Sequence, residues 1–174
     1  ELCYHAATVN HVPLKHCFPG DVEKLFLPLS FDLIASASTF QWFTTPEETF
    51  KKLSKRLEQR GVLVFSTFGK FNLREIRLTT GGGLDYRNKE ELEKMLKPYF
   101  EIELIEEEFH MLEFDTPLAV LQHLKKTGVN VSGDPTIWTK GRVDAFIKDY
   151  NARFAIDGKV ALTYHPLYFV CRRK

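Results

Sequence analysis

Small and acidic residues follow several short apolar runs of this 174-residue chain, and these are the places where chemistry could reside. Asp21 follows a Pro-Gly pair and precedes Val22, while the apolar run 31–35 passes through Ala35 directly into Ser36. An aspartate carboxylate accepts a hydrogen bond from an exocyclic amine such as that of adenine, and Val22 can face the ring. Small residues after a strand leave room for a ligand. Asp21 could equally cap the following turn, with the serines forming an ordinary loop.

Two other motifs are weaker candidates for a site. Potential metal ligands near the N-terminus are scattered, at Cys3, His5, His11, His16 and Cys17. Zinc sites usually pair their ligands at a spacing of about two to four residues, and no second such pair follows, so we expect no metal. The glycine cluster 81–83 could cradle a phosphate with its backbone amides, but a mobile loop is the better interpretation.

Composition indicates one ordinary globular domain. The chain has 24 Lys+Arg against 23 Asp+Glu, a formal net charge of +1, so no overall field attracts it to nucleic acid or to a membrane. No apolar run approaches the roughly 20 residues that a membrane-spanning helix needs, and the start lacks the pattern of a signal peptide. Three cysteines without close pairing favour free thiols. We therefore expect a cytoplasmic protein.

Apolar runs alternate with segments of helical periodicity, which predicts an α/β fold with a mostly parallel sheet. Such sheets bind ligands beyond the carboxyl ends of their strands, which here are the regions of Asp21, Ser36 and Ser66. The helices are expected at 2–9 (a helix end), 46–60, 73–78, 88–97, 116–128 and 139–150, and the strands at 14–18, 31–35, 62–65, 100–111 and 160–171. Two helices and a polar loop before the last strand predict a helical cap at 112–159.

Several motifs resemble a known family. The segments GDVEKL (20–25), FDLIASASTFQW (31–42) and RGVLVFSTF (60–68) resemble the middle of class I methyltransferases, which use S-adenosylmethionine. More particular are HLKKTGVN (123–130) and ALTYHPLYFV (161–170). These two segments, together with Ser-x3-Phe-Gln-Trp, resemble the malonyl-acyl-carrier-protein O-methyltransferases of biotin synthesis.

The resemblance implies a Rossmann-like class I methyltransferase fold lacking its first strands. The family begins with a strand, a glycine-rich turn and a second strand ending in an acid, and this pattern is not found in the chain. Residues 1–174 would then be a partial methyltransferase domain from a longer chain. The cofactor expected from the resemblance is S-adenosylmethionine, held by Asp21, Val22, Ala35 and Ser36.

The implied reaction transfers a methyl group to the free carboxylate of malonyl-acyl carrier protein. A carboxylate with an ordinary pKa near 4 is already ionised at neutral pH, so we nominate no catalytic acid or base. The substrate instead needs a cation or hydrogen-bond donors to position it. The candidates are Gln41, Trp42, Arg74, Arg77, Tyr164 and His165. The simpler interpretations are solvated helix faces for the arginines and core packing for Tyr164 and His165.

The implied partner, acyl carrier protein, is acidic, and a basic surface should receive it. Lys125, Lys126, Lys140 and Arg142 form the basic cluster of the predicted cap, although clustered lysines are more often simply solvated. Two other functions stay open at this point. One is methylation of another small molecule, and the other is a non-catalytic, methyltransferase-like binding or scaffold module.

Overall fold

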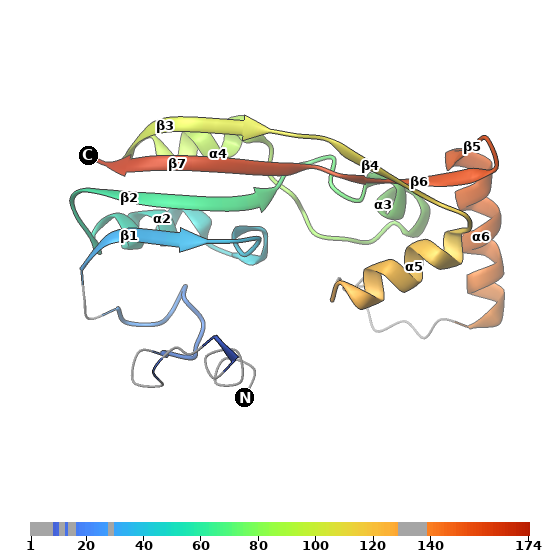
Figure 1. Cartoon of the computed structure of the whole chain (residues 1–174), viewed down its shortest axis with the longest axis horizontal. Helices are drawn as coiled ribbons and strands as arrows, with labels where there is room; N and C mark the ends of the chain where they lie inside the picture. Colours follow the sequence, from blue (N-terminus) through green and yellow to red (C-terminus); the bar gives the residue numbers. More distant parts are fainter. Residues whose placement is uncertain (1–8, 11–12, 14–16, 28–29, 129–138) are drawn as a thin grey trace.

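The computed structural model describes residues 9–10, 13, 17–27, 30–128 and 139–174. The helices and strands in this part of the chain form two packed units (Figure 1). The helices are η2 (Phe40–Trp42), α2 (Pro46–Ser54), α3 (Arg74–Thr80), α4 (Lys89–Leu96), α5 (Pro117–Lys126) and α6 (Lys140–Phe154). The strands are β1 (Phe31–Ser36), β2 (Leu57–Phe68), β3 (Phe100–Glu107), β4 (His110–Phe114), β5 (Ala155–Ile156), β6 (Lys159–Tyr164) and β7 (Pro166–Arg173). The predicted α/β fold is confirmed, but the expectation of a mostly parallel sheet is wrong. Among the described strands β1 and β2 form the one parallel pair, and the other pairings, including both of those made by β7, are antiparallel.

The first unit is a four-stranded sheet in the order β1-β2-β7-β3. β1 pairs in parallel with β2, and β7 is antiparallel to both of its neighbours, so β1, β2 and β3 share one direction and β7 opposes them. The sheet register places Ser36, Phe65, Phe169 and Ile105 in one row across the four strands. Phe65, Phe169 and Ile105 of this row belong to the first apolar core, together with Phe50 of α2 and Leu96 of α4.

The opposite face of this sheet carries the next row, Ala35, Val64, Val170 and Leu104. The helices α2 and α4 do not cover this row; they lie together on the face that carries Phe65 and Phe169 (Figure 1). Val64 and Leu104 are 37% and 45% exposed, which is high for apolar residues of a sheet whose parallel strands are normally buried on both faces. Among the described residues, β1 also has a strand partner on one side only.

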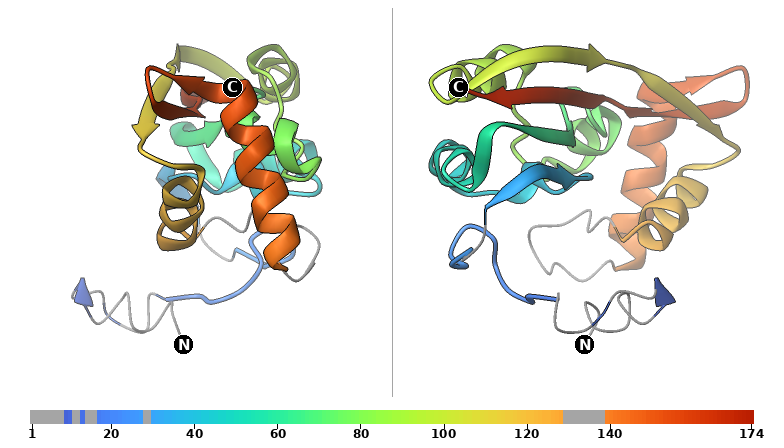
Figure 2. Two further views of the ribbon diagram at one scale, coloured as in Figure 1. Left: turned by 90° about the vertical axis from the view of Figure 1, so that its right-hand side faces the viewer. Right: turned by 60° about the vertical axis from the view of Figure 1, so that its left-hand side comes forward.

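The second unit combines a three-stranded sheet, β4-β6-β5, with α3, α5 and α6. A second apolar core holds it together, with Val120 and Leu124 of α5, Tyr150 of α6 and Leu162 of β6 all fully buried. The right-hand view of Figure 2 shows α5 and α6 side by side at the end of the molecule opposite α2. This core also includes Leu73 and Ile76, so it extends beyond residues 112–159, and the separate cap stays a prediction.

Helix starts follow the capping chemistry of the sequence. Asn88 and Glu91 form a reciprocal capping box at α4, with hydrogen bonds of 2.7 Å and 2.8 Å. Thr116 accepts from the Ala119 N–H at 3.2 Å at the start of α5, and Thr139 caps α6. These three predicted helix starts are confirmed.

Three predicted element boundaries are wrong. The helix expected at 46–60 ends at Ser54, because the chain enters β2 at Leu57, which is fully buried and pairs with Phe31 of β1. The strand expected at 100–111 divides into β3 and β4, which join different sheets. The last strand likewise divides at His165. Apolar alternation continues through both breaks, so the sequence pattern does not reveal that the chain changes sheets.

The predicted helix end at 2–9 and strand at 14–18 lie mostly outside the described residues, as do Cys3, His5, His11 and His16. In the described part of the chain no helix is both long enough and apolar enough to cross a membrane.

Candidate functional site

Ala35 and Ser36 end β1 and face opposite sides of the sheet. Ala35 borders an open, mostly apolar hollow of about 400 Å³ on the face away from α2 and α4. Ser36, Val64, Ser66 and Tyr168 also line this hollow. The small side chains after β1 therefore leave a surface that a flat apolar group can approach.

The chain after Ser36 is held tightly against the end of β2. The Ser38 N–H donates to the Ser66 carbonyl oxygen and hydroxyl, at 3.0 Å and 3.1 Å, while Ser38 adopts a φ of 50°. The Gln41 side-chain amide donates to the Ser38 carbonyl at 2.5 Å and accepts from the Thr67 hydroxyl at 3.2 Å. Gln41 thus lies at the carboxyl ends of both strands. Trp42 next to it is 52% exposed.

Asp21 forms a tight turn, as its simpler interpretation anticipated. Its Oδ1 accepts from the Glu23 N–H at 2.9 Å, and its Oδ2 lies 3.3 Å from Lys24 Nζ. Glu23 in turn accepts hydrogen bonds from the backbone and hydroxyl groups of Thr44 and Thr45. Burial acts to raise the pKa of Glu23, but these four hydrogen bonds outweigh it and the pKa is lowered. The turn carrying Asp21 and Val22 is thereby tied to the start of α2, at the carboxyl end of β1.

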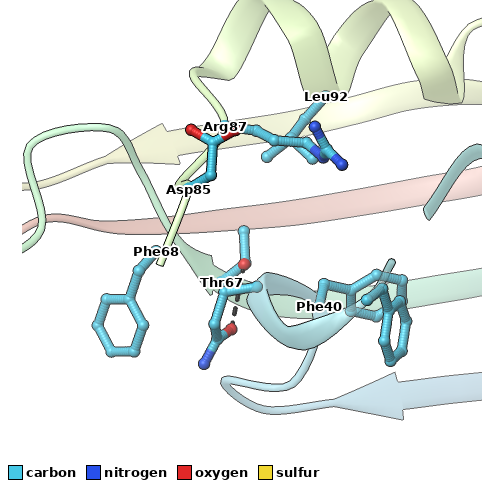
Figure 3. A pocket seen from close by; sticks show the side chains of 8 residues that line it. Phe40, Thr67, Phe68, Asp85, Arg87 and Leu92 are labelled. Carbon is cyan, nitrogen blue, oxygen red and sulfur yellow. Dashed lines mark hydrogen bonds between the residues drawn. The ribbon is translucent and has the colours of Figure 1, made fainter. Parts of the chain in front are cut away.

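A small cavity at the carboxyl ends of β1 and β2 contains two charged residues that the sequence reasoning missed. Asp85 and Arg87 line it together with Gln41, Thr67 and Phe68 (Figure 3). In Figure 3 the Asp85 carboxylate and the Arg87 guanidinium point away from each other. No ion pair between them is found in the described part of the chain. Their segment has no periodicity, so no sequence signal identified them.

The two candidate arginines of α3 differ in environment. Arg74 has a side chain that is 51% exposed, and its Nε lies 3.1 Å from Glu75 Oε1. Arg77 is half-buried, and its Nη2 donates to the Lys70 carbonyl at 2.7 Å. Its guanidinium carbon lies 5.8 Å from the centre of the Tyr86 ring, within cation–π range. The Nε of Arg77 is buried and has no hydrogen-bond partner among the described residues.

The glycine cluster lies against Arg77. Gly81 ends α3 with a φ of 71°, the left-handed conformation typical of a helix C-terminus. Gly83 has a φ of 140°, and a Cβ there would lie 2.8 Å from Arg77 Cγ. Glycine at position 83 therefore allows the backbone to pack on the arginine stem. Burial raises the pKa of Tyr86 beside it, although the hydrogen bond with Asn72 and the charge of Arg77 act in the opposite direction.

Tyr164 and His165 point to different partners. The Tyr164 hydroxyl lies 2.9 Å from His123 Nε2 on α5, and burial raises the tyrosine pKa. His165 is 1% exposed and hydrogen-bonds through both ring nitrogens, to the Phe71 N–H and to Glu107. Whether either side chain contacts a substrate stays a prediction.

The basic residues of the helical unit are exposed, but they lie on two separate helix ends. Lys125 and Lys126 are at the end of α5, and Lys140 and Arg142 are at the start of α6. Figure 1 draws these two ends clearly apart. A partner would have to span both ends to contact all four side chains.

The fold and a sequence comparison together define the class of protein. The methyltransferase domain family Methyltransf_11 matches residues 3–65. The YcgJ protein from Bacillus subtilis, 14% identical, has a TM-score of 0.68 and the alignment covers 98% of this chain and 76% of that one. A candidate methyltransferase from Bacillus halodurans, 16% identical, has a TM-score of 0.61 with 88% and 69% covered. The chain thus has the class I methyltransferase fold.

More similar relatives identify the family. Proteins named malonyl-[acyl-carrier protein] O-methyltransferase are 47% identical over 158 residues in Bacteroides helcogenes and 41% identical over 174 residues in Porphyromonas gingivalis. These alignments cover 90% and 99% of this chain, and 57% and 68% of the relatives. The chain belongs to the malonyl-[acyl-carrier protein] O-methyltransferase family. It spans about three fifths of the length of most of the curated relatives it matches, and about a third of one from Bacteroides fragilis.

Proposed function

We propose that the protein transfers a methyl group from S-adenosylmethionine to the free carboxylate of malonyl-acyl carrier protein, an early reaction of biotin synthesis. The observation that carries this proposal is the similarity, over about nine tenths of the chain, to relatives named for this activity. Bound S-adenosylmethionine supplies an electrophilic methyl group. The acceptor is an ionised carboxylate, so the protein has to position it and exclude water rather than remove a proton.

The residues proposed for the cofactor fit it. An aspartate carboxylate has about four acceptor positions, and the Asp21 side chain is 47% exposed, so it can accept a further hydrogen bond from an amine. Val22 is half-buried beside it, and Ala35 and Ser36 border the open hollow. The hydrogen bonds of Glu23 hold the turn of Asp21 and Val22 at the start of α2, which supports this assignment.

For the acceptor carboxylate, Arg77 is a better candidate than Arg74. The Arg77 Nε has no hydrogen-bond partner among the described residues, so it is a donor that an acceptor carboxylate could use. The Arg74 Nε already has a carboxylate partner. Gln41, Trp42 and Tyr164 are proposed to line the approach to the site.

The experiment measures methyl ester formation by the intact protein with malonyl-acyl carrier protein and with malonyl-CoA. A hydrogen bond to a charged group contributes about 1.5–3 kcal/mol, so Arg77→Ala should lower kcat/KM for either acceptor about 10- to 100-fold. Arg74→Ala, the matched control from the same helix, should lower it less than threefold. Equal losses for the two variants would refute the assignment of Arg77. If the unsubstituted protein forms no methyl ester but binds S-adenosylhomocysteine, another methyl acceptor is favoured. If it does not bind S-adenosylhomocysteine either, a non-catalytic module is favoured.

Docking of the acidic carrier is proposed to use the exposed basic helix ends. Reversing Lys125, Lys126 and Arg142 to glutamate should weaken use of malonyl-acyl carrier protein more than use of malonyl-CoA, because only the carrier protein contacts that surface. Reversing Lys51 and Lys55 is a suitable control. Both lysines are exposed near the C-terminal end of α2, whereas the start of α2 is at the carboxyl end of β1, so they lie away from the proposed site. Equal losses with both acceptors would exclude the docking surface.

A further inference from the structure

The segment that precedes and begins α3 is docked onto the junction between β6 and β7. On the β6 side, the Leu73 N–H donates to the Thr163 carbonyl at 2.8 Å. The buried Glu75 carboxylate accepts from the Thr163 N–H at 2.9 Å and from its hydroxyl at 2.5 Å. These contacts, four and two residues before Arg77, fix the first turn of α3.

His165 provides the other half of this attachment. The Gly69 N–H donates to the His165 carbonyl at 2.8 Å, and the His165 N–H donates to Asn72 Oδ1 at 3.1 Å. The imidazole packs so closely that a Cβ at Gly69 would lie 2.5 Å from it. The Phe109 ring stacks on the imidazole with centroids 4.2 Å apart, and the Phe71 ring lies at 5.6 Å. The imidazole is therefore held in one orientation.

The two ring nitrogens of His165 have distinct roles. The Phe71 N–H can only donate, so Nδ1, 3.1 Å away, must carry a free lone pair. The ring proton then lies on Nε2 and is donated to Glu107 Oε1 at 2.9 Å. The same Glu107 carboxylate is 2.7 Å from Lys89 Nζ. Hydrogen bonding from Lys89, followed by that from His165, lowers the pKa of Glu107, so it remains an acceptor.

One peptide group connects His165 to Arg77. The Phe71 N–H and the Lys70 carbonyl belong to the same planar peptide unit. The N–H of this unit donates to His165 Nδ1, and its carbonyl accepts from Arg77 Nη2 at 2.7 Å. A hydrogen-bonded chain thus runs from Glu107 through the imidazole and the peptide to the guanidinium. Rotation of the peptide would break the contacts at both of its ends.

We propose that His165 is a positioning residue for the methyl acceptor: by accepting from the Phe71 N–H, it orients the 70–71 peptide whose carbonyl holds the Arg77 guanidinium. This inference rests on the proposed function, in which Arg77 receives the acceptor carboxylate. The proposal gives this buried histidine, whose two ring nitrogens are both bonded to protein groups, a defined effect on acceptor binding.

Two substitutions separate the two ring nitrogens. In His165→Asn the side-chain oxygen can replace Nδ1 and accept from the Phe71 N–H, whereas the link to Glu107 is lost. In His165→Gln the longer amide can still donate to Glu107, but no acceptor remains for Phe71. His110→Asn is the matched control, because that histidine is 55% exposed and contacts Glu108.

Steady-state kinetics with malonyl-CoA as acceptor test the proposal. His165→Gln should raise the acceptor KM about tenfold while leaving the KM for S-adenosylmethionine within twofold. His165→Asn should raise the acceptor KM less than threefold, and the control should change neither. Equal increases in both KM values, or an asparagine variant worse than the glutamine variant, would overturn the proposal.

A double-mutant cycle identifies the route of the effect. If His165 acts through Arg77, the double variant His165→Gln/Arg77→Ala should have an acceptor KM less than twofold above that of Arg77→Ala alone. A full tenfold further increase would place the effect elsewhere. Amide hydrogen exchange of Phe71 needs no turnover, and it should be faster in His165→Gln than in His165→Asn; equal rates would refute the hydrogen-bonding role. Failure of the unsubstituted protein to methylate malonyl-CoA would count against the proposed function, while the exchange result would still decide the role of His165.

Discussion

Replacing Glu75 with alanine should cause a large loss of stability, because this carboxylate connects α3 to β6. Glu75 is 1% exposed and accepts two hydrogen bonds from Thr163, one of them from the backbone N–H. A hydrogen bond to a charged group contributes about 1.5–3 kcal/mol, and removing the acceptor leaves a buried N–H without a partner. Since such terms are not additive, we expect the free energy of unfolding to fall by about 3–5 kcal/mol. Glu75→Gln keeps one acceptor oxygen and should cost about 1–2 kcal/mol.

Urea unfolding followed by circular dichroism measures this loss. Glu113→Ala is the control, because Glu113 is 60% exposed and its partner Lys159 lies 3.6 Å away at the surface. A surface pair of this kind contributes about 0–1 kcal/mol. The reasoning is refuted if Glu75→Ala costs less than about 1 kcal/mol, or no more than Glu113→Ala.

Two further predictions concern titratable groups. The pKa of Glu107 is lowered in the folded state, so this group stabilises the folded protein above the ordinary carboxyl pKa, and the stabilisation is lost as the pH falls through the lowered pKa. Urea unfolding midpoints should therefore fall less from pH 7 to pH 2 for Glu107→Gln than for the unsubstituted protein. Parallel curves for the two proteins would contradict this. Burial raises the pKa of the Cys171 thiol to about 12, so at pH 8 a maleimide should label half-buried Cys17 before Cys171, which should react only after unfolding. Peptide mass mapping measures the order, and early labelling of Cys171 would disagree with its burial.

Local structure could be predicted wherever a few neighbouring residues determine it. Asn88, Thr116 and Thr139 begin their helices as expected, because a cap needs only a side-chain oxygen and an N–H about three residues later. The end of the helix predicted at 46–60 could not be found in this way. It depends on Leu57 pairing with Phe31, 26 positions earlier in the chain, and Gly61 also approaches Phe31.

The candidate site was predictable only in part, for a similar reason. The small residues after Ala35 lie at the carboxyl end of a strand, as the sequence indicated. Asp85 and Arg87 approach Gln41 only because α3 and the following segment fold back over the ends of β1 and β2. The two arginines of α3 look alike in the sequence, whereas the structure distinguishes them by burial and partners.

The sequence by itself determined the family, the α/β alternation and the helix starts, because motifs and caps are properties of residues close together in the chain. Only the tertiary structure decided that the chain changes sheets at His165, and that this histidine, the 70–71 peptide and Arg77 form one hydrogen-bonded chain. The physical reason is that the Phe71 N–H and the His165 imidazole are 94 positions apart. Packing of two sheets brings them together, and no local pattern encodes that contact.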